Sequence, residues 1–156
     1  MPVIIILIVV VLVVIVAGLV TWVWRGRSAG RLVGAPVGER EAVFHGGIMS
    51  KTLTTSGLLV KFEFFDWGVR ISGIAPSRWV IPTWEARYDE LAMAELVASP
   101  FSRVAVWLRL RGESGGMGFL SQHSEQILRM LGQQEVPVNR AVTRIKRVED
   151  LYEASR

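Results

Sequence analysis

The residue types that most often carry chemistry are scarce in this sequence, and their spacing matches no known catalytic or metal-binding pattern. It has no cysteine, which excludes a thiol nucleophile, a thiolate metal site and a disulfide. The two histidines, His45 and His123, lie in different segments and belong to no HxxxH pattern. Gly46-Gly47 and Gly115-Gly116 lack the lysine and the strand-to-helix setting of a phosphate loop, and we interpret them as turns. We expect no metal, no cofactor and no catalytic residue.

Four carboxylates between residues 85 and 95 could in principle supply an acid and a base. Alternate residues of a strand face the same side, so such a series usually forms a solvated face, and no pair stands out. The four are Glu85, Asp89, Glu90 and Glu95. We predict that the protein is not an enzyme.

The positive charge is concentrated in one short segment. Residues 25–40 hold four arginines against one glutamate, a net charge of +3, which leaves 14 basic and 13 acidic residues, a net +1, in residues 41–156. A nucleic-acid-binding protein usually spreads its basic excess over a folded face, so this distribution speaks against such a partner. We expect no nucleic acid to bind.

Residues 3–24 contain no charge and a single polar side chain, Thr21. As a helix these residues would rise roughly 33 Å, enough to cross a hydrocarbon core of ~30 Å. The alternative, a cleaved signal peptide, is disfavoured because no basic side chain precedes the run and no small-residue cleavage site ends it. We therefore predict an uncleaved transmembrane anchor over residues 1–24.

Interfacial and charged residues at the end of this run predict its orientation. Tryptophans favour the membrane interface and arginines favour the cytoplasmic side. The predicted anchoring residues are Trp22, Trp24, Arg25, Arg27 and Arg31. The expected location is the inner membrane, crossed once, with the N-terminus outside and the remaining domain in the cytoplasm.

Residues 25–40 are rich in glycine and arginine and show no hydrophobic period, which is typical of a linker. Their arginines either set the topology alone or also contact anionic headgroups, at ~1 kcal/mol each. We leave both alternatives open.

Residues 41–138 are dominated by the period of two that is typical of strands. Residues 60–64 and 69–71 read as one hairpin, and residues 104–110 and 117–120 as a second. Shorter candidate strands are residues 44–49, 79–81, 84–88 and 93–97. We expect a barrel or sandwich of about seven antiparallel strands, with Phe62, Phe64 and Trp84 in its core.

One helix is predicted inside this domain and a helical pattern follows it. Ser121 or Ser124 can cap a helix whose apolar stripe includes Ile127, and Gly132 can end it. Residues 139–156 form an amphipathic tail with apolar residues at helical spacing. The tail binds a partner or a membrane surface, packs back on the barrel, or frays.

The order of strands followed by a capping helix resembles the pleckstrin-homology (PH) superfold. In particular it is similar to small PH-like domains of bacterial, often actinobacterial, membrane proteins with one N-terminal span. The stretches that carry the resemblance are LLVKFEFFDWGVRI, TWEARYDEL, VAVWLRL and SQHSEQILRMLGQQEVPV. The resemblance implies an interaction scaffold that binds lipid headgroups, peptides or proteins, and not a catalyst.

We therefore expect a membrane-anchored binding or assembly module, an accessory subunit that contacts another membrane protein. An anionic-lipid sensor is the alternative, and a component of an enzyme or transporter complex with a shared site is a further one. Trp67, at a hairpin tip, is the aromatic residue expected to make contact. The full set of candidate interaction residues is Trp67, Lys51, Lys61, Arg70, Arg140 and Arg144.

Overall fold

The computed structural model describes residues 2–27, 30–34, 38–55, 57–98 and 103–153, and it places eight strands in one continuous sheet. The strands are β1 (Arg40–Met49), β2 (Val60–Phe65), β3 (Gly68–Gly73), β4 (Trp84–Arg87), β5 (Leu91–Ala98), β6 (Val104–Leu110), β7 (Gly116–Leu120) and β8 (Val138–Arg144). The helices are α1 (Pro2–Arg27), α2 (Ser124–Gln133) and α3 (Glu149–Glu153), with 3-10 turns η1 (Ser77–Trp79) and η2 (Tyr88–Glu90).

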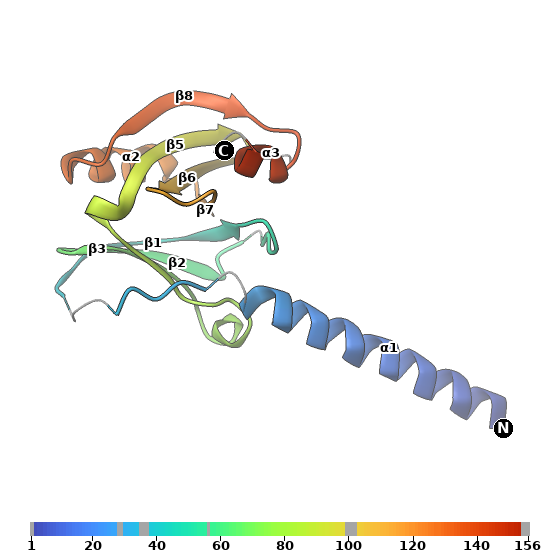
Figure 1. Cartoon of the computed structure of the whole chain (residues 1–156). Coiled ribbons are helices and arrows are strands. Elements are labelled where there is room, and N and C mark those ends of the chain that lie inside the picture. Colours follow the sequence, from blue (N-terminus) through green and yellow to red (C-terminus); the bar gives the residue numbers. More distant parts are fainter. Residues whose placement is uncertain (1, 28–29, 35–37, 56, 99–102, 154–156) are drawn as a thin grey trace.

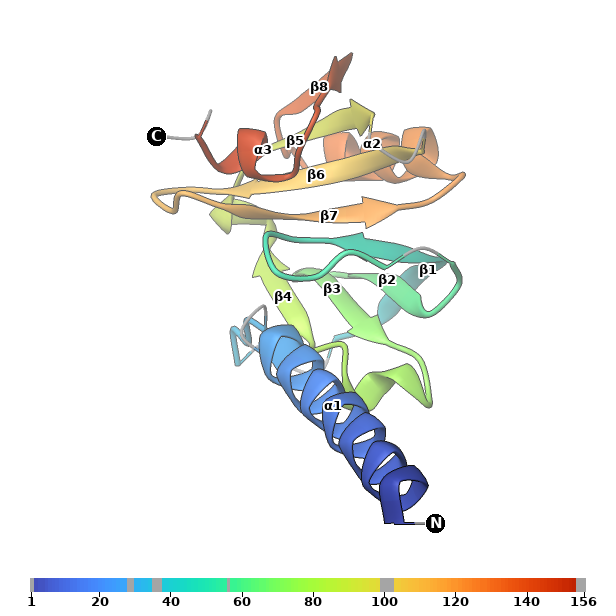
Figure 2. The same cartoon turned by 90° about the vertical axis from the view of Figure 1, so that its right-hand side faces the viewer.

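The sheet bends into two layers that share β1. The strand order is β4-β3-β2-β1-β7-β6-β5-β8, and every neighbouring pair is antiparallel except β5 and β8, which are parallel. Figures 1 and 2 show β1 to β3 in one layer, with β5 to β8 in the other and α2 beside them. The expectation of a mainly β domain is confirmed. The eighth strand comes from the tail, and residues 79–81 form part of η1 and a turn, not a strand.

The pair Gly46-Gly47 is the point at which β1 changes partners. Gly46 is paired with Val60 of β2, and Gly47 is paired with Leu120 of β7. A Cβ on Gly46 would lie 2.1 Å from the carbonyl oxygen of Leu120, so only glycine permits this approach. The interpretation of this pair as a turn is wrong: the glycines lie inside a strand and let the sheet bend.

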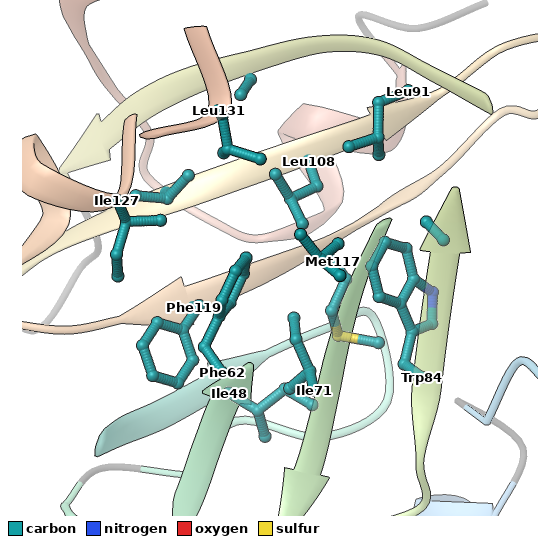
Figure 3. Close-up of a cluster of buried hydrophobic side chains, with 14 of the residues drawn as sticks. Ile48, Phe62, Ile71, Trp84, Leu91, Leu108, Met117, Phe119, Ile127 and Leu131 are labelled. Atoms are coloured by element: carbon teal, nitrogen blue, oxygen red, sulfur yellow. The ribbon is translucent and has the colours of Figure 1, made fainter. Parts of the chain in front are cut away.

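The core lies between the two layers, where alternate side chains of both face inward (Figure 3). Phe62 and Phe64 are fully buried and Trp84 is almost so, which confirms their prediction as core residues. A smaller apolar cluster lies on the opposite side of the second layer, where α3 covers Trp107 with Leu151. Both faces of this layer are therefore packed.

Helix α1 is 26 residues long and projects away from the sheet in Figure 1. Among the described residues, no helix combines the length and the hydropathy that a membrane crossing requires. The prediction of an N-terminal transmembrane anchor is therefore wrong, and the single-pass inner-membrane location that depended on it is not supported.

The C-terminal elements differ from the expected single amphipathic helix. Residues Val138–Arg144 join β5 as strand β8, and the helical spacing beyond them yields only the five-residue α3. Helix α2 forms where predicted and buries Ile127, Leu128 and Leu131. The division of the chain at residues 24, 40 and 138 stays a prediction.

Candidate binding groove

A groove with a volume of about 610 Å³ opens at one end of the two-layered sheet, beside the first turn of α2. Five strands contribute to it, and they are neighbours in the sheet: β1, β7, β6, β5 and β8. Its lining residues are His45, Gly46, Gly57, Leu58, Leu96, Arg103, Val104, Leu120, Ser121, Gln122, Ser124, Glu125 and Val142. Side chains from several strands converge at this end of the sheet, and such concave places are common binding sites.

The walls of the groove expose apolar side chains to solvent. Leu58 is 69% exposed, Val142 is 50% exposed and Val104 is 36% exposed, while Leu96 and Leu120 are buried beneath them. One exposed aliphatic residue is ordinary on a protein surface, but several around one concavity indicate a contact surface. The groove can therefore bury apolar groups of a ligand.

The first turn of α2 forms one wall and is held by its own serine side chains. The Ser124 hydroxyl donates to the carbonyl oxygens of Ser121 (2.6 Å) and Val104 (3.0 Å), and Ser121 Oγ accepts from the backbone N–H of His123. The ring of His123 packs on Phe44, with 5.8 Å between ring centroids. These contacts fix the wall before any ligand binds.

An edge strand with a bulge forms the opposite wall. In β8, Asn139 is paired with Glu95 and Thr143 is paired with Val97. Residues 140–142 of β8 therefore lie opposite a single residue of β5, Leu96. The Asn139 side chain stabilises this bulge by accepting the backbone N–H of Ala141 at 3.0 Å. A bulge at a sheet edge redirects side chains, and here Val142 reaches the groove.

Three arginines surround this wall without ion pairs in the described part of the chain. Arg103 lines the groove, and Arg140 and Arg144 flank Val142 on β8. All three are exposed. The acidic residue that lines the groove is Glu125, so positive charge is in excess around it.

The segment after α1 lies against the first layer of the sheet as a strap, which we define as the described residues 30–34 and 38–39. The Arg31 backbone pairs with β4: its N–H donates to Thr83 and its carbonyl accepts from Glu85. The Arg31 guanidinium donates to both carboxylate oxygens of Glu90, each at 3.2 Å. The predicted linker thus covers the open edge of β4.

The carboxylate that holds the strap has a perturbed pKa. Burial acts to raise the pKa of Glu90, but hydrogen bonds from the Arg31 side chain and the Arg87 backbone, with the charges of both arginines, hold this pKa below its ordinary value. The Glu90–Arg31 pair is therefore ionised at neutral pH.

The structure places two of the predicted interaction residues in internal ion pairs. Arg70 Nε lies 2.8 Å from Glu85 Oε1, and Lys61 Nζ lies 3.0 Å from Glu63 Oε1. Both glutamates are buried. Trp67 is half-buried and stacks on a neighbouring phenylalanine ring. These three residues lie on the outer face of the first layer and do not line the groove.

Arg140 and Arg144 lie beside the groove on β8, whereas Lys51 lies elsewhere. Lys51 is exposed, its backbone N–H donates to the Tyr152 hydroxyl (3.1 Å), and its ammonium lies 5.9 Å from that ring. Of the predicted anchoring residues, Arg31 belongs to the strap. The other predicted anchoring residues belong to α1, in a stretch whose side chains the structure does not describe: Trp22, Trp24, Arg25 and Arg27.

The sequence did not identify Leu58, Val104 and Arg103 as groove residues. No local pattern distinguishes residues that come together only when distant strands pair. Sequence reasoning also missed the exposure of Trp79, which was assigned to a strand. Trp79 is 82% exposed and borders a second depression of about 550 Å³. In the described ranges, no group of three His, Cys, Asp or Glu side chains is placed to hold a metal ion.

Comparison with known proteins does not assign this chain to a family. No family model matches the chain, and no curated protein matches it. One solved structure that matches is described as "Structure of the Spt16D Pob3N heterodimer", with a TM-score of 0.47 and 12% identity over 68% of this chain. The match spans 57% of that chain. At this TM-score the likeness carries no argument about fold or function, and the PH-like resemblance stays a prediction.

Proposed function

We propose that the β domain is a binding module that holds an extended, apolar segment of a partner protein in the groove, and that the chain acts as an accessory subunit of that partner. The observation that carries the proposal is the convergence of exposed Leu58, Val104 and Val142 on one concavity. A PH-like scaffold of bacterial origin, as the sequence resemblance implies, is consistent with this role and stays a prediction.

The length of the groove suits a peptide. Its five strands are successive in the sheet, and four spacings of ~4.8 Å give about 19 Å. An extended chain advances ~3.3 Å per residue, so roughly six residues fit across the strands. Alternate side chains of such a segment would face the apolar walls.

Two of the predicted interaction residues, Arg70 and Lys61, give the lipid-sensing alternative no support. A headgroup phosphate needs cations that are free to bind it, and Arg70 and Lys61 are each paired with a buried glutamate. Releasing either cation would leave a buried carboxylate without its partner. The apolar walls of the groove match the side chains of a protein segment, so we favour this occupant over a headgroup.

The test is selection of binders from a displayed library of random twelve-residue peptides. The full chain is used, held in a mild detergent because α1 exposes apolar side chains. We expect enriched peptides whose affinity falls at least tenfold in Leu58→Asp and in Val142→Asp, because each change places a charge on an apolar wall. Leu32→Asp is the matched control, since Leu32 is similarly exposed and does not line the groove.

Two results would refute the proposal. One is a selection that enriches no peptide above the unselected library. The other is a set of binders whose affinity changes equally in the groove variants and in Leu32→Asp. Both variants change exposed side chains, so circular dichroism should show that they remain folded.

A further inference from the structure

We infer that the groove selects acidic partner segments, with carboxylates that flank an apolar centre. This inference rests on the proposed function and adds the charge of the ligand to it. Its basis is the position of three arginines relative to the apolar wall, together with their lack of ion pairs in the described chain.

The strand register places two of these arginines at the same end of the groove. Arg144 is paired with Ala98, and Ala98 is paired with Val104 on its other side. Arg144 therefore lies two strand spacings, roughly 10 Å, from Val104, and Arg103 directly precedes that valine. A carboxylate above Ala98 would be within reach of both guanidinium groups.

The same register assigns Arg144 to the face that carries the groove. Thr143 is paired with Val97, which packs in the cluster under α3, on the opposite side of this layer. Side chains alternate along a strand, so Arg144 faces the other way, toward the side on which Leu96 and Val104 lie. The third arginine, Arg140, is at the far end of the bulge, beyond Val142.

Several other cations of the domain are held in internal ion pairs. Arg70, Arg109 and Lys61 are each within 3.0 Å of a buried carboxylate oxygen, and Arg31 is bound to Glu90. Their charge is compensated inside the chain. The arginines around the groove have no such partner, so an incoming carboxylate meets guanidinium groups that are already free, and no internal ion pair has to break.

Electrostatic pairing at an exposed site has a defined size and salt dependence. An exposed ion pair contributes little on its own, and reversing the charge of one arginine also adds repulsion, so each reversal should weaken binding about 3- to 10-fold. The Debye length falls from ~10 Å at 0.1 M to ~3 Å at 1 M ionic strength. Binding of an acidic segment should therefore weaken with added salt, whereas the apolar contribution should persist.

The experiment uses the peptides selected above. We expect them to be enriched in Asp and Glu, and we expect Arg103→Glu and Arg144→Glu each to weaken binding 3- to 10-fold. Arg78→Glu is the control, because Arg78 is exposed, has no ion pair in the described chain and borders the other depression. Raising the salt concentration should remove most of the difference between the native chain and the groove variants.

The outcomes separate this inference from the function on which it rests. Binders that need Leu58 and Val142 but are neutral or basic would overturn the inference and leave the proposed function intact. A library that yields no groove-dependent binder would overturn both. Sedimentation with vesicles of phosphatidylglycerol that is lost in Arg103→Glu and Arg144→Glu, in the absence of peptide binding, would assign these arginines to a lipid surface and also overturn the inference.

Discussion

Replacing Arg70 tests whether this residue stabilises the fold or is held available for a ligand. Its Nε lies 2.8 Å from Glu85 Oε1, and its guanidinium lies 4.9 Å from the centre of the Phe65 ring. The Glu85 side chain is only 7% exposed, whereas that of Arg70 is 32% exposed. Arg70→Met keeps an apolar stem against Phe65 and leaves the Glu85 carboxylate without its partner.

The expected loss follows from this asymmetry. Breaking a fully buried ion pair costs about 3–5 kcal/mol, and losing a cation–π contact costs about 0.5–1 kcal/mol. Because a third of the Arg70 side chain is in contact with water, solvent reaches this pair and reduces the penalty. We expect Arg70→Met to lower the free energy of unfolding by about 2 kcal/mol, out of the roughly 5–15 kcal/mol typical of a domain.

Urea denaturation of the full chain, followed by circular dichroism and tryptophan fluorescence, measures this loss. The control is Arg78→Met, which removes an exposed arginine and should change stability by less than about 0.5 kcal/mol. Adding Glu85→Gln to Arg70→Met should recover part of the loss, because it removes the uncompensated charge. An Arg70→Met chain as stable as the control, or a double variant no more stable than Arg70→Met, would refute the reasoning.

Two further predictions concern the helix wall and the strap. Leu128 is fully buried in α2, so Leu128→Ala should cost about 2–5 kcal/mol in urea denaturation, and a loss below 1 kcal/mol would show that α2 does not pack on the barrel. Because the folded pKa of Glu90 is depressed, its pairing with Arg31 stabilises the strap above the ordinary glutamate pKa of ~4.3, and this contribution is lost as pH falls through the lower, folded value. Carbon-13 NMR of the Glu90 carboxyl should give a midpoint below that of a free glutamate, and Arg31→Met should raise it; equal midpoints in the two chains would contradict the assignment.

The strands were predictable because their signal is local. The even positions of residues 104–110 form an unbroken apolar face, and β6 forms over that same range. Both hairpins form where turn residues separate the predicted strands. The strand prediction for residues 79–81 is wrong because Trp79 and Ile81 alone are too few positions to establish a period of two. In the structure they belong to η1 and the turn that follows it.

The groove could not be predicted because its residues meet only through long-range pairing. Leu58 and Val142 are more than eighty residues apart in the chain, and they line one groove because β1 is shared by both layers. Val142 was even assigned to a helical period, since apolar residues at positions 142, 145 and 148 fit it. Pairing with β5 outweighed this weak local preference and made β8 a strand.

The glycine pair at 46 and 47 was a usable signal that was interpreted incorrectly. Glycine inside an alternating run marks either a turn or a close approach of two backbones. The flanking residues 44 and 48 are both apolar and keep the strand period across the pair, which favours the second interpretation. In the structure, Phe44 and Ile48 both face the core, on either side of the point where β1 passes from β2 to β7.

Ion pairing also changes which positive charges are available to a partner. By sequence, the excess charge lies in residues 25–40, which suggested that this segment makes the electrostatic contacts. In the structure Arg31 is held by Glu90, and Arg40 is held by the buried Glu63 at 3.3 Å. Internal carboxylates thus compensate these two cations, whereas Arg103 and Arg144, in the nearly neutral part of the sequence, have no such partner in the described chain. A count of charges along a sequence therefore locates an electrostatic surface only after the pairs that folding creates are subtracted, and here the subtraction removes Arg31 and Arg40 and keeps Arg103 and Arg144.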